Sequence, residues 1–352
     1  MTVVKLPSGR WQARFKIGRV QVDSATRDTK REAEAWLRRQ RAAHRDGYDP
    51  RLGKVRVSVL LTEWLKMRES AVSSTTYATD QQLSVSKVLP EWFKQMNVNA
   101  VTSKHVEQWQ SALLARGLTA TSVRRYRSSL SPFFGWCVRE HYIQVNPVAP
   151  VDPPKDWRAD LGINPFNEKE LADVATDVAK FDQTYATLVT VLGWTGIRWG
   201  EARAMPVAGF VHEATPLLLV SRSQTEGNAV KNTKSGKVRR VPLANTALPL
   251  VEEFAAGKAP DDLLFTTPSG GQLHRATFIR KTHWTPTAKH PGTGRGRSIH
   301  DLRHTAACLW LSKGVPLGTV QAWLGHASIA TTNKYLHHLG DYADRVALDL
   351  LN

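Results

Sequence analysis

This chain of 352 residues lacks several features that define well-known classes of protein. No apolar run approaches the ~18 residues that a helix needs to cross a bilayer. The first residues, MTVVKLPSGRWQARF, contain no apolar core of the secretory type, so we expect neither a membrane segment nor export. There are two cysteines, Cys137 and Cys308, and both lie among apolar residues. That setting is typical of buried free thiols in a reducing cytoplasm, and it excludes a zinc site built on cysteine.

Two motifs of cofactor-dependent enzymes are also missing. The chain has no phosphate-binding GxxxxGK(S/T) loop and no cluster of carboxylates that would hold a divalent ion. The glycines in GTGRGRS, residues 292–298, resemble a nucleotide loop, but no predicted strand precedes them. A flexible basic loop near DNA is the better interpretation of that fragment. We therefore expect no cofactor, neither a nucleotide nor a metal.

Basic residues are abundant, since 48 lysines and arginines against 31 aspartates and glutamates give a net charge of +17. The excess is densest in residues 1–55, with 14 basic and 6 acidic side chains, and it stays positive over residues 56–150 and 151–352. A field of this kind attracts polyanions, of which nucleic acid is the usual one. A ribosomal or membrane-surface protein can be equally basic, so the charge predicts a partner and leaves the chemistry open.

Residues 1–55 are predicted to form a small separate domain. In the strand GRWQARFKI, one face is apolar at Trp11, Ala13 and Phe15. The opposite face carries polar donors, at Arg10, Gln12, Arg14 and Lys16. Gly18 allows a tight reversal into a second strand, and a capping box of Thr29 and Glu32 then starts a helix. A sheet backed by a helix can enter the major groove of DNA, which we favour over a merely solvated polar face.

Residues 56–146 are predicted to be almost entirely helical, because four successive fragments show helical spacing of apolar residues. In the last helix, Arg124, Arg125 and Arg127 lie off the apolar stripe, where they could meet phosphates. Five prolines then fall in residues 147–165, which suits an extended linker. Helices and two strands follow in residues 166–352, which predicts a mixed α+β domain. The expected fold class is thus multidomain and mainly α, with small antiparallel β-sheets.

Four fragments of the last domain stand out by their polar residues and spacing. They are TGIRWGEARAM around Arg198, NTKSGKVRRVPL around Lys234, IHDLRHTAACLWL from His300, and LGHASIATTNKYLHH with His326 and Tyr335. Together they resemble the tyrosine recombinase family, also called phage integrases. The match is carried by Arg198 with Glu201 three residues later, by the His300-x-x-Arg303 pair, and by Tyr335 nine residues after His326.

The resemblance implies an enzyme that breaks and rejoins DNA with Tyr335 as its nucleophile. Attack on a phosphodiester builds charge on the nonbridging oxygens. The planar forks of Arg198 and Arg303 are suited to bind those oxygens, with His326 as a further donor and Glu201 in support. The product would be a covalent 3′-phosphotyrosine with a free 5′-hydroxyl, and exchange of one phosphoester for another requires neither ATP nor metal.

Two proton transfers are implied by the same resemblance. The leaving deoxyribose oxygen needs a proton, and a lysine whose pKa is lowered by neighbouring cations can donate one. The family match assigns this task to Lys234, with Lys237 as a competitor. The tyrosine, with a free pKa of about 10, must lose its proton, and His300 could assist.

Other interpretations of these residues are weaker. Out of context, Arg198 and Glu201 would make an ordinary structural ion pair. The fragment HDLRH resembles the zincin motif HExxH, but Asp301 replaces the glutamate that zincin chemistry needs, and Arg303 would place a cation beside the metal. Tyr342 is a rival nucleophile, but its spacing from the preceding histidine motif does not fit.

The layout of the chain implies how such an enzyme would act. Residues 56–146 look like the core-site DNA-binding domain of the family, and residues 1–55 are similar in layout to the arm-site-binding domain of lambda-type integrases. The implied partners are double-stranded DNA with core and arm attachment sites, three further protomers in a homotetramer on a Holliday junction, an excisionase and a host DNA-bending protein. The tail, residues 340–352, would dock on a neighbouring protomer or pack in cis.

Two rival functions share parts of the pattern. A Xer-type resolvase has the same chemistry but usually lacks an arm-binding unit, so residues 1–55 argue against it. A non-catalytic DNA-binding regulator would have a broken catalytic motif, and none of the expected positions is replaced. We therefore expect a phage or mobile-element integrase that acts in the cytoplasm of a bacterial host, at the nucleoid.

Overall fold

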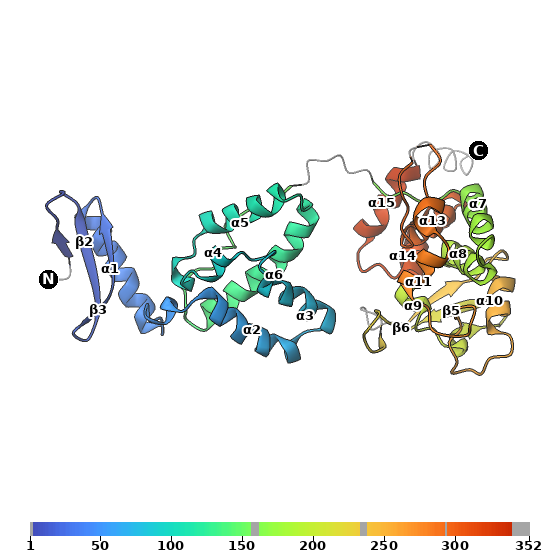
Figure 1. Ribbon diagram of the computed structural model, residues 1–352, viewed down its shortest axis with the longest axis horizontal. Helices are drawn as coiled ribbons and strands as arrows, with labels where there is room; N and C mark the ends of the chain where they lie inside the picture. The colour runs from blue at the N-terminus through green and yellow to red at the C-terminus, as the bar shows by residue number, and fades with distance from the viewer. Residues whose placement is uncertain (1–2, 156–161, 233–237, 293, 340–352) are drawn as a thin grey trace. The chain divides into compact units, whose positions relative to one another are not determined.

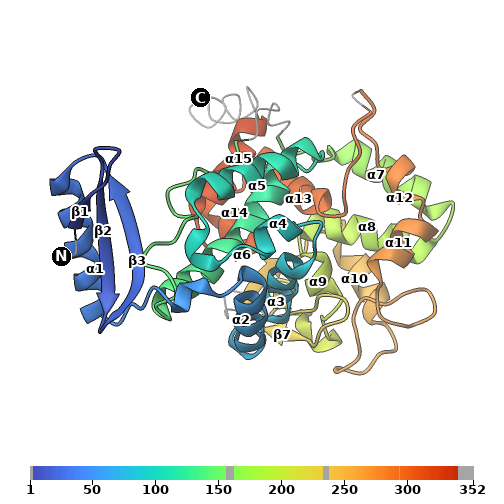
Figure 2. The same ribbon diagram turned by 60° about the vertical axis from the view of Figure 1, so that its left-hand side comes forward.

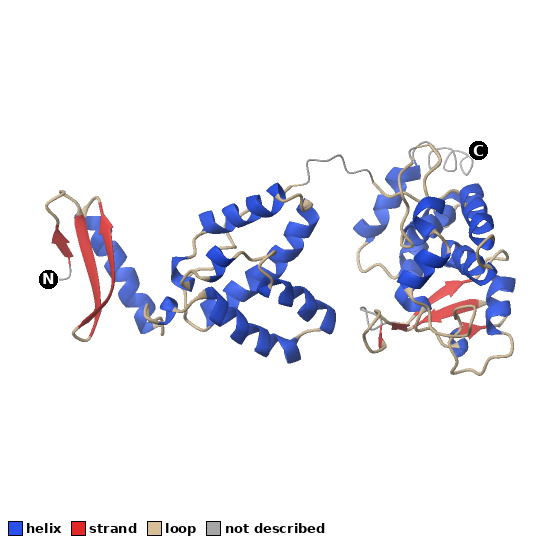
Figure 3. Ribbon diagram, viewed as in Figure 1, coloured by secondary structure: helices blue, strands red, loops and turns tan. Residues whose placement is uncertain are grey.

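A computed structural model describes residues 3–155, 162–232, 238–292 and 294–339 of the chain. The chain divides into two compact units, Met1–Asp160 and Leu161–Asn352. Figure 1 colours the chain from blue at the N-terminus to red at the C-terminus, and Figure 3 shows that both units are mainly helical with small sheets. Each unit has its own buried apolar side chains, which lie in separate clusters.

The first unit begins with a three-stranded antiparallel sheet. Its strands, in order across the sheet, are β1 (Val3–Lys5), β2 (Trp11–Ile17) and β3 (Val20–Arg27). A helix, α1 (Lys30–Arg45), lies along one face of the sheet, as Figure 2 lets the reader follow. Its Trp36 belongs to the same buried apolar cluster as Ala13 and Phe15 of β2. The predicted capping box is confirmed, because the Thr29 hydroxyl accepts from the Glu32 backbone and the Glu32 carboxylate accepts from the Thr29 backbone.

The other face of this sheet is polar. In the ladder between β2 and β3, Gln12 lies opposite Thr26, and Arg14 lies opposite Ser24. Lys16 follows a β-bulge in the same ladder and is exposed. Amide, guanidinium, ammonium and hydroxyl groups therefore share one face, while the apolar residues of β2 point toward α1.

Helices make up the rest of the first unit. The α-helices are α2 (Val57–Ala71), α3 (Ser74–Gln81), α4 (Glu91–Lys94), α5 (Ser103–Ala115) and α6 (Ala120–Arg139). Short 3-10 helices are η1 (Leu52–Lys54), η2 (Gln82–Ser84) and η3 (Val98–Ala100). Large aromatic side chains fill the core, among them the fully buried Trp64, Trp109 and Phe133. The predicted helical character of this stretch is confirmed.

The proline-rich segment after α6 starts inside this helical core. Val148 and Val151 are buried and belong to the same apolar cluster as Trp109. Asn146 helps to fold the chain back, because its side-chain oxygen accepts from the Val148 backbone at 2.9 Å. The first residues of the segment that we predicted as a linker therefore pack with the helices that precede it.

The second unit combines nine described α-helices with five short strands. The α-helices are α7 (Glu168–Ala179), α8 (Gln183–Thr195), α9 (Trp199–Ala202), α10 (Leu248–Ala255), α11 (Arg275–Lys281), α12 (Trp284–Thr287), α13 (Asp301–Ser312), α14 (Leu317–Leu324) and α15 (Ile329–Leu339). The other elements are η4 (Val207–Gly209), β4 (Phe210–Val211), β5 (Leu217–Val220), β6 (Arg222–Ser223), β7 (Lys231–Asn232) and β8 (Arg239–Pro242). β4, β5 and β8 form one antiparallel sheet, and β6 pairs with β7. The two predicted strands are confirmed as β5 and β8.

Helices α8 and α13 pack against each other in the core of this unit. α7 covers α8, while α14 and α15 pack on α13. This packing brings together the end of α8, the first turns of α13 and the last helix, which are the places where the polar motifs of the sequence fall. Although α8 and α13 are rich in apolar residues, no helix among the described residues is long and apolar enough to span a membrane.

Candidate active site

Arg198 follows the end of α8, where the chain reverses. Gly196 ends that helix with a φ of 61°, a conformation that glycine adopts without strain. A Cβ at this position would lie 3.0 Å from the Cβ of Ala306 and 3.1 Å from Leu324, so the glycine also lets α13 and α14 approach closely. Arg198 comes two residues later, at the start of α9, with 41% of its side chain exposed.

Glu201 holds the guanidinium of Arg198. Its buried carboxylate accepts from the Arg198 backbone N–H at 2.6 Å and from Arg198 Nη1 at 2.8 Å. It also accepts two bonds from Arg239 of β8, at 2.7 Å from Nη1 and 2.6 Å from Nη2. Burial alone would raise the pKa of Glu201, but the hydrogen bonds and charge of Arg239, together with Arg198, lower it to about 2. The predicted pair is therefore a cluster of one carboxylate with two guanidinium groups.

Arg239 connects this cluster to the end of α14. Its Nε donates to the carbonyl of Trp323 at 2.8 Å. Gly325 ends α14 with a φ of 67°, and a Cβ there would lie 2.9 Å from Arg239 Cδ. Because His326 is the next residue, Arg239 supports the turn that presents this histidine.

Arg303 is a buried arginine of α13, with 2% of its surface exposed. Its Nη1 donates to the carbonyl of Gly196 at 2.7 Å, and its Nη2 donates to the carbonyl of Leu324. These bonds join the ends of α8 and α14 through one side chain. Burial and the charge of Arg198 lower the pKa of Arg303 to about 9, which leaves the guanidinium charged at neutral pH.

Two histidines lie on either side of Arg303 on α13. His300 is exposed at the start of the helix, and His304 lies one turn later, with the ring centroids 4.9 Å apart. Neighbouring protein groups displace part of the water around the His300 ring, and this desolvation, followed by the charges of Arg303 and Arg198, lowers the pKa of His300. Burial, and then the neighbouring His300, lower the pKa of His304 to about 4. Both rings are therefore mainly neutral at pH 7.

Tyr335 lies on α15, in the fragment that begins with His326. His326 Nδ1 lies 2.9 Å from Oγ1 of the fully buried Thr332, one helical turn before Tyr335. The Tyr335 ring is 3% exposed and stacks on the His326 ring at a centroid separation of 6.2 Å. Burial raises the pKa of Tyr335, whereas the positive charges of Arg303 and Arg198 oppose that shift.

The hydroxyl of Tyr335 contacts His304. Its oxygen lies 3.0 Å from His304 Nδ1, and the two ring centroids are 5.6 Å apart. The sequence predicts that His300 assists the tyrosine, and this role stays a prediction, because the histidine at the hydroxyl in the structure is His304. His300 instead lines a cavity together with the two arginines. His300 has the spacing from Arg303 that the motif requires. However, it is His304, one turn later on α13, that faces α15.

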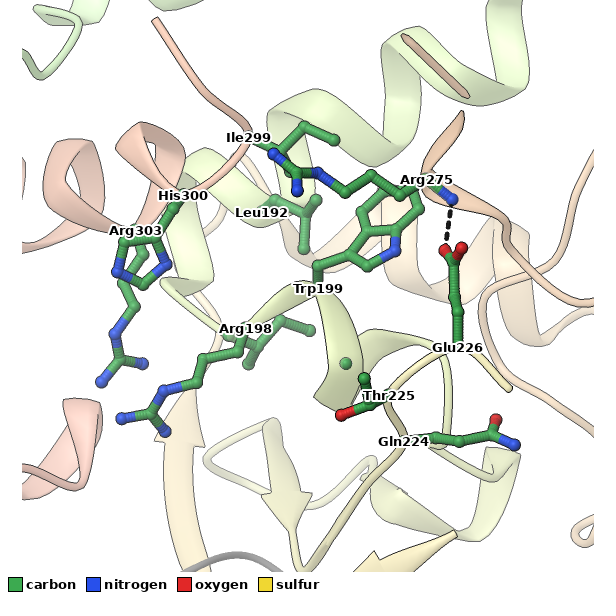
Figure 4. Close-up of a pocket in the computed structure, with 12 residues that line it drawn as sticks. Leu192, Arg198, Trp199, Gln224, Thr225, Glu226, Arg275, Ile299, His300 and Arg303 are labelled. Atoms are coloured by element: carbon green, nitrogen blue, oxygen red, sulfur yellow. Dashed lines mark hydrogen bonds between the residues drawn. The ribbon is translucent and has the colours of Figure 1, made fainter. Parts of the chain in front are cut away.

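A cavity of about 420 Å³ opens beside these residues. Figure 4 shows the guanidinium groups of Arg198 and Arg303 near each other at one end, next to His300. At the other end, Glu226 accepts a hydrogen bond from the backbone N–H of Arg275 at 2.5 Å. Two guanidinium groups beside an imidazole can bind an anion that has several oxygens, such as a phosphodiester.

Some predicted residues lie outside the described residues. Lys234 and Lys237 both fall in residues 233–237, between β7 and β8. Tyr342 and the predicted tail fall in residues 340–352. The choice between the two lysines, and the docking of the tail, therefore stay predictions.

In the part of the chain that the structure describes, no three His, Cys, Asp or Glu side chains lie close enough together to hold a metal ion. The zincin interpretation requires His300 and His304 to face one ion, whereas His304 Nδ1 faces the Tyr335 hydroxyl. The prediction for the cysteines is confirmed, because Cys137 and Cys308 are free and buried. Burial raises the pKa of each thiol to about 12.

The predicted DNA-binding residues of the N-terminal sheet are engaged in weak local contacts. Arg10 precedes β2 and forms an exposed ion pair with Asp28 at 2.9 Å. Arg14 Nε donates to the side-chain oxygen of Gln12 at 2.9 Å, so these two side chains are oriented together on the outer face. Lys16 is exposed. The geometry suits a polyanion, and the contact with DNA stays a prediction.

The three arginines predicted as phosphate contacts on α6 differ from one another. Arg124 and Arg125 are exposed, and each donates to a threonine hydroxyl. Arg127 is half-buried, and its Nη2 donates to the carbonyls of Val148 and Val151 at 2.9 and 2.6 Å, while its contact with phosphate stays a prediction. It lies off the apolar stripe as predicted, but the chain after α6 folds back over it. Its guanidinium therefore holds that chain on the helical core.

Three residues near the tyrosine are absent from the prediction: Arg239, His304 and Thr332. Arg239 lies two residues before the buried Val241 on β8 and therefore on the same face, which is the signal of an inward-facing cation that needs a carboxylate. His304 and Thr332 each lie one helical turn from a predicted residue, and therefore on the same face. Which helical faces meet depends on how α13 and α15 cross, which periodicity does not specify.

Models of known protein families match this chain in three consecutive parts. The phage integrase family matches residues 163–341, which is half of the chain. A phage integrase N-terminal domain matches residues 2–46, and a phage integrase N-terminal SAM-like domain matches residues 61–141. The resemblance predicted from the four fragments is confirmed.

Two curated relatives extend the comparison. The ICEBs1 integrase of Bacillus subtilis is 25% identical over an alignment of 366 residues, gaps included, which covers 96% of this chain and 96% of the relative. The tyrosine recombinase XerD of Pseudomonas aeruginosa is 30% identical over 238 residues, which cover 64% of this chain and 73% of the relative. The similarity to the first relative includes the N-terminal part of the chain.

Two solved structures have a similar fold. The Tn1549 transposon integrase in complex with transposon right end DNA matches with a TM-score of 0.70 at 17% identity, over 84% of this chain and 99% of that one. A lambda integrase tetramer bound to a Holliday junction matches with a TM-score of 0.62 at 16% identity, over 93% and 96%. The predicted fold class is confirmed: multidomain and mainly α, with small antiparallel sheets.

Proposed function

The chain belongs to the phage integrase family of tyrosine site-specific recombinases, and on that premise we propose that it is the integrase of a phage or another mobile element. It cleaves DNA at a specific site through a covalent 3′-phosphotyrosine and rejoins the ends to a second DNA. The same chemistry in reverse excises the element. This proposal assigns the nucleophile to Tyr335 and phosphate binding to Arg198, Arg303 and His326.

One observation carries the proposal. Segments that lie far apart in the sequence bring two guanidinium groups and two imidazoles to one tyrosine. Arg198 and Arg303 lie together at one end of the cavity, and the charges of both act on the Tyr335 hydroxyl. His326 stacks on the same tyrosine ring. An ordinary structural tyrosine does not need two neighbouring arginines.

In the proposed reaction, a DNA phosphate lies between Arg198 and Arg303. The Tyr335 oxygen attacks phosphorus, so that the bond from phosphorus to the tyrosine forms while the bond to O5′ of the deoxyribose breaks. The two guanidinium forks stabilise the charge that builds on the nonbridging oxygens. Glu201 supports this task, because its contact with Arg198 keeps that guanidinium at the cavity. Because one phosphoester replaces another, the strand is resealed by the reverse reaction.

His326 provides a further donor to the phosphate. Burial, and then the charges of Arg303 and Arg198, lower the pKa of His326 to about 4, so its ring is neutral at pH 7. When the Thr332 hydroxyl donates to Nδ1, the proton of the neutral ring is on Nε2. We propose this tautomer, whose Nε2–H donates to a phosphate oxygen.

Lys234 is proposed as the acid that protonates the leaving O5′, with Lys237 as the alternative. A DNA substrate whose 5′ leaving group is a thiol needs no such proton, because a thiolate leaves readily. We expect this substrate to restore cleavage by Lys234→Ala. The cleavage rate of Lys237→Ala relative to the wild type should be the same on this substrate as on ordinary DNA. Selective rescue of Lys237→Ala would instead assign the acid to Lys237.

The domain roles follow from the same proposal. Residues 1–55 hold arm sites, residues 56–146 and 166–352 clamp the core site, and residues 147–165 connect them. The match of an N-terminal integrase domain to residues 2–46 supports the first role. Lambda integrase is known as a tetramer on a Holliday junction, and we propose the same assembly here. An excisionase and a host DNA-bending protein would set direction, in a bacterial cytoplasm.

A Xer-type resolvase is the alternative function. The XerD relative supports the same chemistry, but its similarity covers 64% of this chain, whereas the similarity to the ICEBs1 integrase covers 96%. Deletion of residues 1–55 separates the two functions. An integrase should keep cleavage of a minimal core site and lose recombination that depends on arm sites. A resolvase should recombine minimal sites at the rate of the full chain.

The nucleophile is tested with a nicked suicide substrate that traps the covalent adduct. Tyr335→Phe should bind this DNA like the wild type and form no adduct, because the phenyl ring has no oxygen to attack with. Tyr342→Phe is the matched control, and it should retain the wild-type amount of adduct. An adduct in Tyr335→Phe, or its loss in Tyr342→Phe alone, would contradict the assignment.

A further inference from the structure

The proposed reaction gives no role to one contact of the Tyr335 hydroxyl. The Tyr335 hydroxyl oxygen lies 3.0 Å from Nδ1 of His304, a hydrogen-bond distance. His300, which shares the α13 motif with Arg303, lines the cavity. The histidine that touches the reacting oxygen is thus a different residue from the histidine that faces the substrate.

The packing of α13 fixes the position of the His304 ring. The residues on either side of it, Arg303 and Thr305, are 2% and 0% exposed, so the backbone at this turn is firmly held. The His300 ring meets the His304 ring edge to face at an interplanar angle of 83°. α15 packs on α13 and brings the Tyr335 ring to a centroid distance of 5.6 Å. The contact therefore joins two helices whose relative position is set by buried residues.

The charges around His304 favour a neutral ring. Burial, and then His300, lower its pKa to about 4; Arg303 and Lys334 act in the same direction, and Asp301 opposes them. A neutral imidazole has one nitrogen with a free lone pair, which can accept the phenolic proton. A bound DNA phosphate would offset the charge of the arginines, so the ring becomes a better proton acceptor when substrate is present.

We propose that His304 is the proton acceptor for Tyr335 in the DNA cleavage step. As the bond from the Tyr335 oxygen to phosphorus forms, the phenolic proton moves to His304 Nδ1. The bond from phosphorus to O5′ breaks at the same time, and the leaving oxygen takes its proton from the lysine acid. In resealing, the proton on Nδ1 returns to the tyrosine oxygen. This inference rests on the proposed function, because it requires Tyr335 to be the nucleophile.

The first test measures the single-turnover rate of adduct formation on a suicide substrate at saturating DNA. We expect His304→Leu to be about a hundredfold or more slower than the wild type, the usual range for loss of a general base. His304→Asn keeps a polar group near the position of Nδ1 but takes no proton, so it should remain at least about tenfold slower. His212→Leu is the matched control, because His212 is an exposed histidine outside this cavity, and its rate should equal the wild-type rate.

The second test replaces Tyr335 by a fluorinated tyrosine, whose phenol ionises at lower pH. An ionised nucleophile needs no acceptor, so the defect of His304→Asn should shrink by about tenfold or more in the fluorinated chain. A purely structural defect would not respond to the acidity of the phenol. The same replacement should leave the defect of His300→Asn unchanged, because His300 faces the substrate and not the phenol.

The outcomes separate this inference from the proposed function. If the wild type forms no adduct, or Tyr335→Phe still forms one, the proposed function fails. If the wild type reacts through Tyr335 while His304→Leu or His304→Asn keeps the wild-type rate, only the role of His304 is overturned. An unchanged defect of His304→Asn in the fluorinated chain, or rescue of His300→Asn instead, overturns it as well.

Discussion

Arginine is used in different ways at the two ends of this chain. In the Leu161–Asn352 unit, Arg303 is buried and the side chain of Arg239 is 9% exposed, and both bond to a carboxylate or to backbone carbonyls. In the N-terminal sheet, Arg10 is more than half exposed and pairs with an even more exposed Asp28. Hydrogen bonds hold each of these two guanidinium groups of Arg239 and Arg303 in one position, which suits chemistry on a single phosphate. The exposed side chain of Arg10 can adjust its position to a DNA phosphate, which suits binding that depends on charge.

The largest expected effect comes from removing the buried carboxylate. Glu201→Gln leaves the Arg239 and Arg198 cations without their counter-charge, and a broken buried pair of this kind typically costs about 3–5 kcal/mol. We expect urea unfolding to show a loss of that order and adduct formation to fall steeply. The exposed pair provides the comparison, because Asp28→Asn should change the free energy of unfolding by less than about 0.5 kcal/mol. Equal losses in the two variants would contradict the distinction.

A smaller effect separates two neighbouring arginines of α6. Arg127→Ala removes two bonds to backbone carbonyls, and we expect the free energy of unfolding to fall by about 1–3 kcal/mol. Arg125→Ala removes an exposed side chain, so its stability should stay within about 0.5 kcal/mol of the wild type while its DNA affinity falls. Denaturation curves and a binding assay on a core site measure both. The reverse pattern would support Arg127 as a phosphate contact.

The histidines of the active site predict how stability depends on pH. The pKa values of His304 and His326 are lowered from about 6.5 in the unfolded chain to about 4 in the fold. Between these values the unfolded chain binds protons that the folded chain does not, so stability should fall as the pH is lowered from about 6.5 to about 4. Each histidine adds up to about 1.4 kcal/mol per pH unit, less where water screens the ring.

Substitution of the histidines isolates this dependence from that of the carboxylates. His304→Asn and His326→Asn should each flatten the dependence of the urea midpoint on pH in that range. The exposed His212 provides the control, since His212→Asn should follow the wild-type curve. Identical slopes for all four proteins would show that the two active-site rings are not held neutral.

The smallest expected effect concerns the N-terminal sheet. If Arg14 and Lys16 neutralise phosphates, each alanine variant should make the negative slope of log affinity against log salt less steep by about 0.9. The loss of affinity should be the same for all DNA sequences. Substitution of Thr26 on the same face should leave the slope unchanged, because a hydroxyl carries no charge. Binding of an arm-site duplex measured at several salt concentrations reports both. A slope that does not respond would remove these two side chains from the DNA contacts.

Local pattern predicts much of this fold and part of the site. The capping box of Thr29 and Glu32 and the alternation in β2 are short-range features, and both occur where the sequence places them. β1 escapes prediction because three residues are too few to show a period. Val148 and Val151 lie in a proline-rich stretch, and only their contact with the helical core shows that they are buried.

Long-range contacts account for the rest. The motif spacing identifies Arg198, Arg303 and Tyr335, because a chemical role depends on residue type and order along the chain. The contact of His304 with Tyr335, and of Arg239 with Glu201, depends on how helices and a strand cross in three dimensions. Periodicity places these residues on a face and leaves open which element that face meets.

The central claim is that Tyr335 becomes covalently joined to DNA, and mass spectrometry of the trapped adduct tests it most directly. A suicide substrate is reacted with the wild type, and the adduct is digested with trypsin and nuclease. Cleavage after Lys334 gives a peptide that contains both Tyr335 and Tyr342, so fragmentation must locate the nucleotide. We predict a 3′-phosphonucleotide on Tyr335. A nucleotide on Tyr342, on another residue, or on no residue would contradict the account.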